Sequence, residues 1–164
     1  MKKIYYTWLD IQSQTQEILR QMHVDGWQPD YVVGLTRGGL APGNLVSQYL
    51  GVPMETLKVS LRDDGQCESN CWMSEDAYQG KNILIVDDIN DSGATMNWIR
   101  QDWQGSSCPN DSRWAQIWGD NVRIAVLVDN ESSDCELPIS YSAIEVNKIE
   151  NPQWIIFPWE DWWK

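Results

Sequence analysis

ILIVDDINDSGATM, residues 83–96, joins an apolar run to a polar loop that carries one glycine and two hydroxyl side chains. Residues 82–86 predict a buried strand, and a helix is expected over residues 96–103. Gly93 lets the backbone approach a ligand closely. The start of a helix offers unpaired amides and the positive end of its dipole. This combination predicts a pocket for a phosphate monoester between the strand and the helix.

Two carboxylates, Asp87 and Asp88, come directly before this loop. A carboxylate next to a phosphate is repelled unless a hydroxyl-rich sugar or a metal ion lies between the charges. Carboxylates accept hydrogen bonds from a ribose diol and suit hydrated Mg²⁺, so the segment describes a site for ribose 5-phosphate. The lysine of an ATP-type phosphate loop is missing. In the alternative interpretation, Asp87, Asp88 and Asp91 only cap a helix and solvate a turn.

A second turn lies in VVGLTRGGLAPG, residues 32–43, where a predicted strand (residues 31–35) leads into a predicted helix (residues 41–50). Arg37 adds a fixed positive charge with a planar set of donors, and Gly38 exposes a backbone amide. These groups suit a pyrophosphate. Taken without the motif in residues 83–96, the same residues would be interpreted as an ordinary turn between a strand and a helix.

Apolar strand patterns alternate with helical patterns along the chain. The remaining predicted elements are a helix over residues 7–23 capped by Thr7, strands over residues 56–61 and 122–128, polar loops over residues 62–80 and 105–112, and short strand-like pieces within residues 144–164. This order predicts a single α/β domain, residues 1–164, with a mainly parallel central sheet flanked by helices. Ligands of such sheets bind beyond the carboxyl ends of the strands. Residues 36–39, 87–95 and 128–131 are therefore expected to meet at one cleft.

The formal net charge of −12 disfavours a polyanionic partner such as DNA, although backbone amides and an arginine can still hold a small anion. No apolar run approaches the ~20 residues that a membrane span needs, and the start MKKIYYTWLD lacks the apolar stretch of a signal peptide. We therefore expect a cytoplasmic protein with no membrane or nucleic-acid partner. Cys67 and Cys71 form a poor zinc pattern without a second pair, so free thiols are expected.

The segment VDDINDSGAT closely resembles the signature with which type I phosphoribosyltransferases bind phosphoribosyl pyrophosphate (PRPP). The resemblance implies that Asp87 and Asp88 approach the ribose hydroxyls and the shell of a Mg²⁺ ion, with Asp88 as the metal-binding residue. It also implies that the loop cradles the 5-phosphate through Asp91, Ser92, Gly93, Ala94 and Thr95. Asp91 further matches the acid that handles the proton on base nitrogen N7 in purine members.

Two more segments resemble bacterial xanthine–guanine phosphoribosyltransferases. TRGGLAPG is similar to their pyrophosphate loop, which implies that Arg37 and Gly38 bind the pyrophosphate and that Arg37 offsets its charge during transfer. WIIFPWED, residues 154–161, resembles their Trp-Ile-x-x-Pro-Trp-Asp segment. This implies a small C-terminal hood in which Trp154 stacks on the base and the Ile155 backbone lies at the base edge. Alternatively, these tryptophans are hydrophobic contacts at a subunit interface.

Two departures from the family pattern concern the base and the lid. Many 6-oxopurine enzymes of this group have a lysine that donates to the base oxygen O6 after the strand matching residues 122–128, and here that position is Asp129. A carboxylate accepts rather than donates, so Asp129 is predicted to contact the base and to disfavour a 6-oxo group. A Ser-Tyr pair of the lid is replaced by Ser60-Leu61, which indicates a different closure of residues 62–80.

The resemblance implies a Mg²⁺-dependent enzyme that moves ribose 5-phosphate from PRPP to a nucleobase, with a purine as the expected base, and that forms a homodimer or homotetramer. Two alternatives stay open. One is a regulator of the same fold that senses PRPP or nucleotides without catalysis, and the other is a transferase for a pyrimidine or another acceptor. The chain has neither a basic surface nor an added DNA-binding module, which disfavours the regulator.

Overall fold

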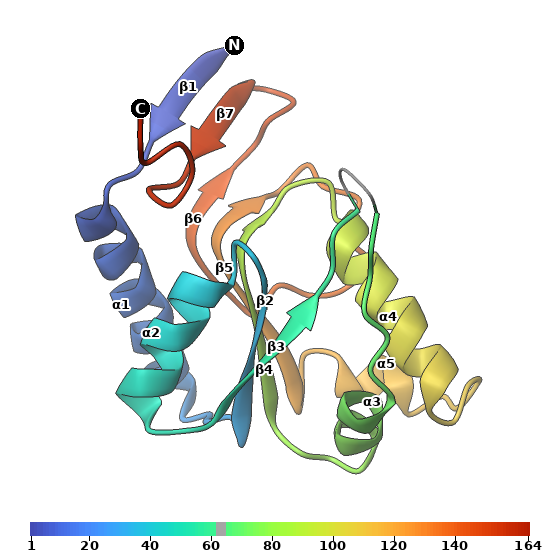
Figure 1. The fold of residues 1–164 in the computed structure, drawn as a ribbon. Helices are drawn as coiled ribbons and strands as arrows, with labels where there is room; N and C mark the ends of the chain where they lie inside the picture. Colours follow the sequence, from blue (N-terminus) through green and yellow to red (C-terminus); the bar gives the residue numbers. More distant parts are fainter. Residues whose placement is uncertain (62–64) are drawn as a thin grey trace.

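Five parallel strands form the central sheet of the computed structural model, which describes residues 1–61 and 65–164 (Figure 1). Their order across the sheet is β3-β2-β4-β5-β6, and every neighbouring pair is parallel. The strands are β2 (Tyr31–Thr36), β3 (Met54–Lys58), β4 (Ile83–Asn90), β5 (Val122–Asn130) and β6 (Tyr141–Val146). The predicted α/β fold with a mainly parallel sheet is confirmed.

Helices cover both faces of this sheet (Figure 1). One face carries α1 (Trp8–Asp25) and α2 (Leu40–Leu50), and the other carries α3 (Cys71–Tyr78), α4 (Ala94–Ser106) and α5 (Trp114–Ile117). Because both faces are covered, the middle strands are apolar on both sides, and Ile83 to Val86 of β4 are fully buried. Two hydrophobic cores result, one on each side of the sheet.

A separate two-stranded sheet joins segments from the two ends of the chain. β1 (Lys2–Tyr5) pairs in parallel with β7 (Gln153–Ile156). Figure 1 shows this pair above one end of the central sheet, next to both termini. We call residues 2–5 and 153–163 the hood. Its C-terminal part was expected from the sequence, whereas its partner strand β1 was not predicted.

The first helix is predicted correctly, and both of its ends have local causes. Thr7 Oγ1 accepts a hydrogen bond from the Asp10 backbone amide at 3.1 Å, and the Asp10 carboxylate accepts one from the Thr7 amide at 2.7 Å. This reciprocal cap satisfies two amides that a helix start otherwise leaves unpaired. The helix ends at Asp25 because Gly26 takes the left-handed conformation, with φ at 64°.

Strand β4 is longer than predicted. The strand was expected to end at Val86 and to turn at the acids, but it continues to Asn90. Asp87, Ile89 and Asn90 all pair with residues of β5, so the neighbouring strand supplies partners for their backbone groups. The two predicted ribose-binding acids therefore lie on a strand rather than in a turn.

The polar segment over residues 62–80 is only partly a loop. Cys71–Tyr78 forms α3, and the Asn70 side chain caps it by accepting a hydrogen bond from the Met73 amide at 2.9 Å. The predicted lid closure falls partly on residues 62–64, which lie outside the described residues. Helix α4 runs to Ser106, two residues into the loop predicted over residues 105–112, and the short helix α5 begins after that loop, at Trp114.

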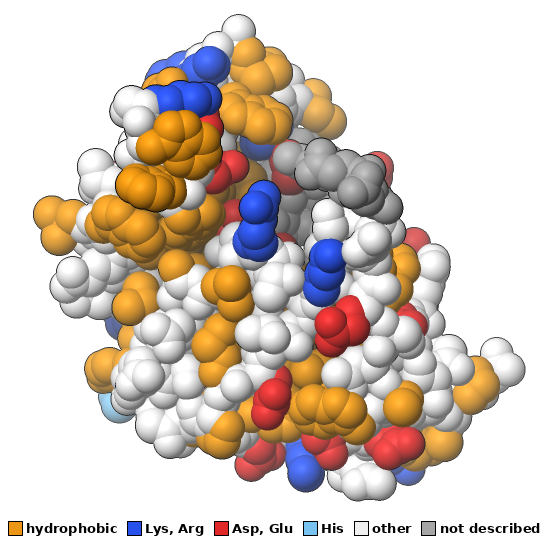
Figure 2. Space-filling view, viewed as in Figure 1, with side chains coloured by type: hydrophobic (Ala, Val, Ile, Leu, Met, Phe, Trp, Pro, Cys, Tyr) orange, Lys and Arg blue, Asp and Glu red, His pale blue; other side chains and the backbone are white. Residues whose placement is uncertain are grey.

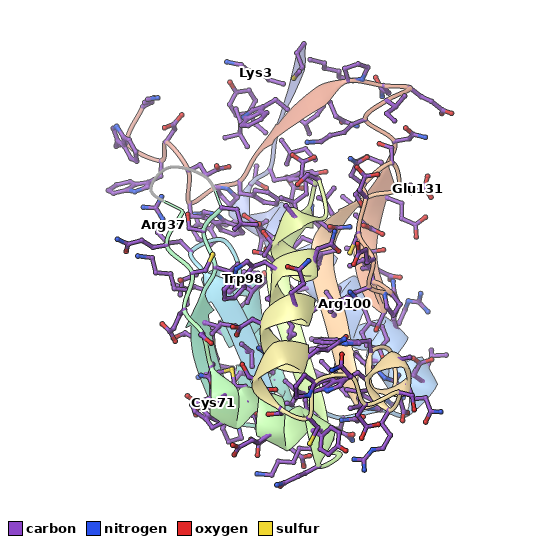
Figure 3. All side chains as sticks on the ribbon, turned by 90° about the vertical axis from the view of Figure 1, so that its right-hand side faces the viewer. Lys3, Arg37, Cys71, Trp98, Arg100 and Glu131 are labelled. Atoms are coloured by element: carbon purple, nitrogen blue, oxygen red, sulfur yellow. The ribbon has the colours of Figure 1, made fainter. Side chains whose placement is uncertain are left out.

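No helix in residues 1–61 and 65–164 is long and apolar enough to cross a membrane. The four cysteines carry free thiols; they are Cys67, Cys71, Cys108 and Cys135. Figure 3 shows Cys71 far down the molecule from Arg37 and from the hood residue Lys3. Cys71 is therefore separate from the cavity at the strand ends.

Candidate active site

A cavity of about 860 Å³ opens at the carboxyl ends of β2 and β4, beneath the hood. Figure 2 shows the molecule hollowed between the hood and the body. The turn between β2 and α2, the segment from β4 to α4, and the hood all line the cavity. Two of the three strand ends that were predicted to converge, residues 36–39 and 87–95, meet here. The third, residues 128–131, is not part of the described lining.

The segment between β4 and α4 has the form of an anion site. Gly93 has a φ of 89°, and a Cβ there would lie 2.4 Å from the Cys135 backbone nitrogen, so a side chain is excluded by conformation and by space. Helix α4 begins directly after Gly93 without a side-chain cap. The amide of Ala94 donates to Ser92 Oγ at 3.2 Å, Gly93 itself offers no side-chain cap, and Ala94, Thr95 and Met96 of the first turn line the cavity. The backbone amides at a helix start attract phosphate groups.

Asp87 and Asp88 line the same cavity from the end of β4. Burial raises the pKa of Asp87 well above its usual range, and the neighbouring Asp88 charge adds to the shift. Burial is also the main cause that raises the pKa of Asp88. The carboxylates accept hydrogen bonds from the backbone amides of Asp88 at 2.9 Å and Ile89 at 2.7 Å. Two crowded acids of this kind favour a cation or hydroxyl donors in front of them.

Mg²⁺ fits these donors when a ligand completes its shell. Within the described part of the chain, no three His, Cys, Asp or Glu side chains gather as a metal cage. Mg²⁺ is usually held by only one or two carboxylates together with substrate phosphates and water. Asp87 and Asp88 beside a phosphate loop match that pattern, and a cation there would offset the cost of two partly buried charges.

The turn between β2 and α2 packs tightly against β4. A Cβ on Gly39 would lie 2.2 Å from the Val86 carbonyl oxygen. The Gly39 amide donates to the Leu35 carbonyl at 2.8 Å, which fixes the turn. Arg37 and Gly38, just before it, line the cavity, and Arg37 is exposed at the cavity edge (Figure 3). A guanidinium at this edge suits an anionic ligand.

The hood presents aromatic side chains to the cavity. Trp154 on β7 is 43% exposed, and Ile155 next to it is buried. Phe157 and Trp159 stack with their ring centroids 5.0 Å apart, and both line the cavity. A partly exposed indole at a cavity wall suits a flat ring. The geometry is therefore compatible with the base position predicted beside Trp154.

Asp129 does not lie with the other predicted base contacts, which corrects its expected position. Its Oδ1 atom accepts a hydrogen bond from Asn90 Nδ2 at 2.8 Å, because the two residues oppose each other in β4 and β5. Lys148 lines the cavity instead and pairs with Asp91 at 2.8 Å. Lys148 was not predicted. The one feature of the sequence that could have drawn attention to Lys148 is that it is the only Lys or Arg in residues 124–163.

The remaining predicted site residues all line the cavity; they are Arg37, Gly38, Asp87, Asp88, Asp91, Ser92, Gly93, Ala94, Thr95, Trp154 and Ile155. Ser60 and Leu61 line it as well, and so do Glu160 and Trp163, which were not predicted. A shared cavity brings these residues together. Their individual roles stay predictions.

Comparison with known proteins agrees with this geometry. Over residues 3–161 the chain matches the family described as the phosphoribosyl transferase domain. The chain belongs to this family. The resemblance to type I phosphoribosyltransferases, predicted from the VDDINDSGAT segment, is confirmed.

This phosphoribosyl transferase domain is similar to curated xanthine-guanine phosphoribosyltransferases. It is 30% identical to the one of Vibrio parahaemolyticus over 102 residues, which cover 61% of this chain and 65% of the relative. It is 29% identical to the one of Idiomarina loihiensis over 107 residues, which cover 61% of this chain and 64% of the relative. The matches thus span slightly less than two thirds of the relatives' length.

Solved structures share the fold over nearly the whole chain. A purine phosphoribosyltransferase from Pyrococcus horikoshii has a TM-score of 0.68 at 21% identity and covers 98% of this chain and 96% of its own. A Helicobacter pylori xanthine-guanine-hypoxanthine phosphoribosyltransferase has a TM-score of 0.67 at 17% identity, with 97% and 94% covered. At these identities the likeness shows the fold of the domain.

Proposed function

We propose that this phosphoribosyl transferase domain moves ribose 5-phosphate from PRPP to a purine base and releases pyrophosphate. The observation that carries the proposal is that one cavity joins a phosphate loop, an acid pair and an aromatic wall. The start of α4 suits the 5-phosphate, Asp87 and Asp88 suit the ribose diol, and Trp154 suits the base. The likeness to xanthine-guanine phosphoribosyltransferases supports a purine.

In this proposal, PRPP is held at both of its ends. Residues 91–95 bind the 5-phosphate, while Arg37 and Gly38 bind the pyrophosphate. Holding the far ends converts binding energy into alignment of the reacting C1 atom. Asp88 is the proposed protein ligand of Mg²⁺, which when bound would supply positive charge beside the pyrophosphate.

The transfer step exchanges one bond at C1 for another. A ring nitrogen of the base forms a bond to C1 as the bond from C1 to the pyrophosphate oxygen breaks. Pyrophosphate leaves with the bonding electron pair, and Arg37 offsets the charge that develops on it. The base gives up its N7 proton to the carboxylate of Asp91, which acts as a general base.

A panel of free bases tests the proposal. The purified chain is incubated with PRPP, Mg²⁺ and one base at a time: guanine, xanthine, hypoxanthine, adenine, uracil or orotate. Pyrophosphate release and nucleotide formation are followed together. We expect both products with at least one purine, and neither product when EDTA removes the metal.

Other outcomes would redirect the proposal. PRPP binding without turnover of any base would favour a sensing regulator, and turnover of uracil or orotate alone would assign a pyrimidine. The predicted homodimer or homotetramer is measured by size-exclusion chromatography with light scattering. The cytoplasmic location stays a prediction.

A further inference from the structure

The phosphate loop between β4 and α4 contacts a segment that is not part of the described cavity lining. This segment, residues 130–137, begins at the end of β5, and we call it the brace. The amide of Asp134 donates to the Ser92 carbonyl oxygen at 3.0 Å. A Cβ on Gly93 would lie 2.4 Å from the Cys135 nitrogen, so the two backbones are in close contact there. The loop therefore lines the cavity and is supported by the backbone of the brace.

Asn97, on the first turn of α4, makes two further contacts with the brace. Its Nδ2 atom donates to the Asp134 carbonyl oxygen at 3.0 Å, and its Oδ1 atom accepts from the Glu136 amide at 2.7 Å. These two partners lie on either side of Cys135, the residue that packs on Gly93. One side chain therefore fixes the backbone of the brace to the start of the helix.

Two other contacts hold the brace, but they differ from that of Asn97. The buried side chain of Asn130 donates to the Asp91 carbonyl oxygen at 2.8 Å and accepts from the Lys148 amide at 3.0 Å. Because Lys148 lines the cavity, loss of Asn130 would disturb two parts of the site at once. Arg100, labelled on α4 in Figure 3, pairs with the brace at 3.1 Å, but both partners are partly exposed and such pairs contribute little.

The phosphate loop needs support from outside because it contains a glycine. Gly93 adopts a left-handed φ of 89° at no steric cost, but a glycine also has more alternative conformations than any other residue. Backbone amides bind a phosphate well only when they are held in the orientation that the anion requires. Contacts that restrict the loop before the ligand arrives reduce the entropy that binding would otherwise cost.

We propose that Asn97 is a positioning residue for the phosphate loop, because it holds the brace against Gly93 and so keeps the loop amides ready for a 5-phosphate. The proposal rests on the proposed function. Asn97 is not part of the described cavity lining, so it acts through the backbone of Asp134 and Glu136 and not by touching the ligand. Its loss should weaken the phosphate end of the site and leave the pyrophosphate end unchanged.

The test measures two ligands separately by calorimetry of the purified chain with Mg²⁺ present. Ribose 5-phosphate reports on the phosphate loop, and pyrophosphate reports on the turn that carries Arg37 and Gly38. Asn97→Ala removes two hydrogen bonds, which predicts a rise in the Kd for ribose 5-phosphate of about 5- to 50-fold. The Kd for pyrophosphate should not change. A general loosening of the structure would instead weaken both ligands.

Asn121→Ala is the matched control. The Asn121 side chain also joins backbone groups of two segments, since its Nδ2 atom donates to the carbonyl oxygens of Ala77 and Lys81, each at 2.9 Å. It comes just before β5, away from the cavity lining. Both affinities should be unchanged in this variant. If it weakens ribose 5-phosphate as much as Asn97→Ala does, the special role of Asn97 is disproved.

The outcomes separate this proposal from the proposed function. If the unmodified chain binds neither PRPP nor ribose 5-phosphate, the proposed function itself fails. If it binds ribose 5-phosphate and Asn97→Ala binds it equally well, or loses both ligands to the same extent, only the role of Asn97 fails. Thermal unfolding followed by tryptophan fluorescence checks that each variant is folded. If Asn97→Ala is not folded, Asn97→Ser is judged by the same criteria, because its neutral hydroxyl is too short to bridge both backbone groups.

Discussion

Gly38 packs so closely on Asp88 that a Cβ on Gly38 would lie 2.0 Å from Oδ2 of the carboxylate. The proposed pyrophosphate turn and the proposed magnesium acid thus occupy adjoining space. Neither residue can change size without moving the other. This contact links the ends of β2 and β4 directly, in addition to their ladder of backbone hydrogen bonds.

Gly38→Ala is expected to impair ligand binding more than folding. The added methyl group meets the far end of a side chain rather than backbone, so the Asp88 carboxylate can rotate away at the expense of its proposed role. We expect the affinity for PRPP in the presence of Mg²⁺ to fall at least ~10-fold, or about 1.4 kcal/mol. Calorimetry measures the affinity, and thermal melting measures the stability.

Gly105→Ala is the control for that variant. Gly105 lies within α4, and nothing lies within 4 Å of a Cβ built on it. Alanine is a better helix former than glycine, so stability should rise by about 0.5–1 kcal/mol with unchanged PRPP affinity. Equal PRPP affinities in the Gly38→Ala and Gly105→Ala variants would argue against the proposed role of the Gly38–Asp88 contact.

Asp91→Asn should separate binding from transfer. The amide has nearly the shape of the carboxylate but cannot take up a proton at neutral pH, so PRPP binding should persist. Loss of a general base predicts a fall in kcat of about 10²- to 10⁴-fold. Rapid-quench measurement of nucleotide formation gives the rate. A variant as active as the unmodified chain would remove Asp91 from its proposed role.

Trp154→Leu should weaken binding of the base and leave binding of PRPP unchanged. Stacking of a base on an aromatic side chain contributes about 1–3 kcal/mol, so we expect KM for the base to rise about 5- to 100-fold. Trp162→Leu is the matched control, because Trp162 is 75% exposed and contacts Trp163 edge-on at 6.0 Å. If both variants raise KM equally, the effect does not come from stacking on Trp154.

Cys135 should react more slowly with iodoacetamide than the exposed thiols. Burial raises the pKa of Cys135, so less of it is thiolate at pH 8, and the thiolate is the reactive form. Cys71 and Cys108 are exposed. We expect peptide mass spectrometry to show labelling of Cys135 at least ~10-fold slower in the native protein. The difference should vanish in urea, and its persistence there would exclude burial as the cause.

The phosphate side of the site could be predicted because its residues are contiguous. An apolar strand, two acids, a glycine and a helix start follow one another in residues 83–96, and each has a local physical reason. The length of β4 could not be predicted in this way. Asp87, Asp88 and Asn90 are residue types that favour turns, but pairing with β5 overrides that preference.

The part of the site proposed to bind the base depends on pairing between strands, which leaves no local pattern in the sequence. Lys148 reaches Asp91 only because β4, β5 and β6 lie side by side and Asn130 ties the segments together. Asp129 was expected at the base because it occupies the position at which many related 6-oxopurine enzymes carry a base-contacting lysine. Its partner Asn90, however, is set by the register between β4 and β5, which the sequence does not show.

The pairing of β1 with β7 also has a consequence for the order of folding. Residues 87–95 can become ordered as soon as β4 and α4 have formed. The wall that carries Trp154 instead requires residues 2–5 and 153–156 to meet, which closes nearly the whole chain into a loop. In refolding experiments, residues 87–95, which would bind the sugar phosphate, should therefore become ordered early. The hood wall that carries Trp154, which would contact the base, should be the last part to form.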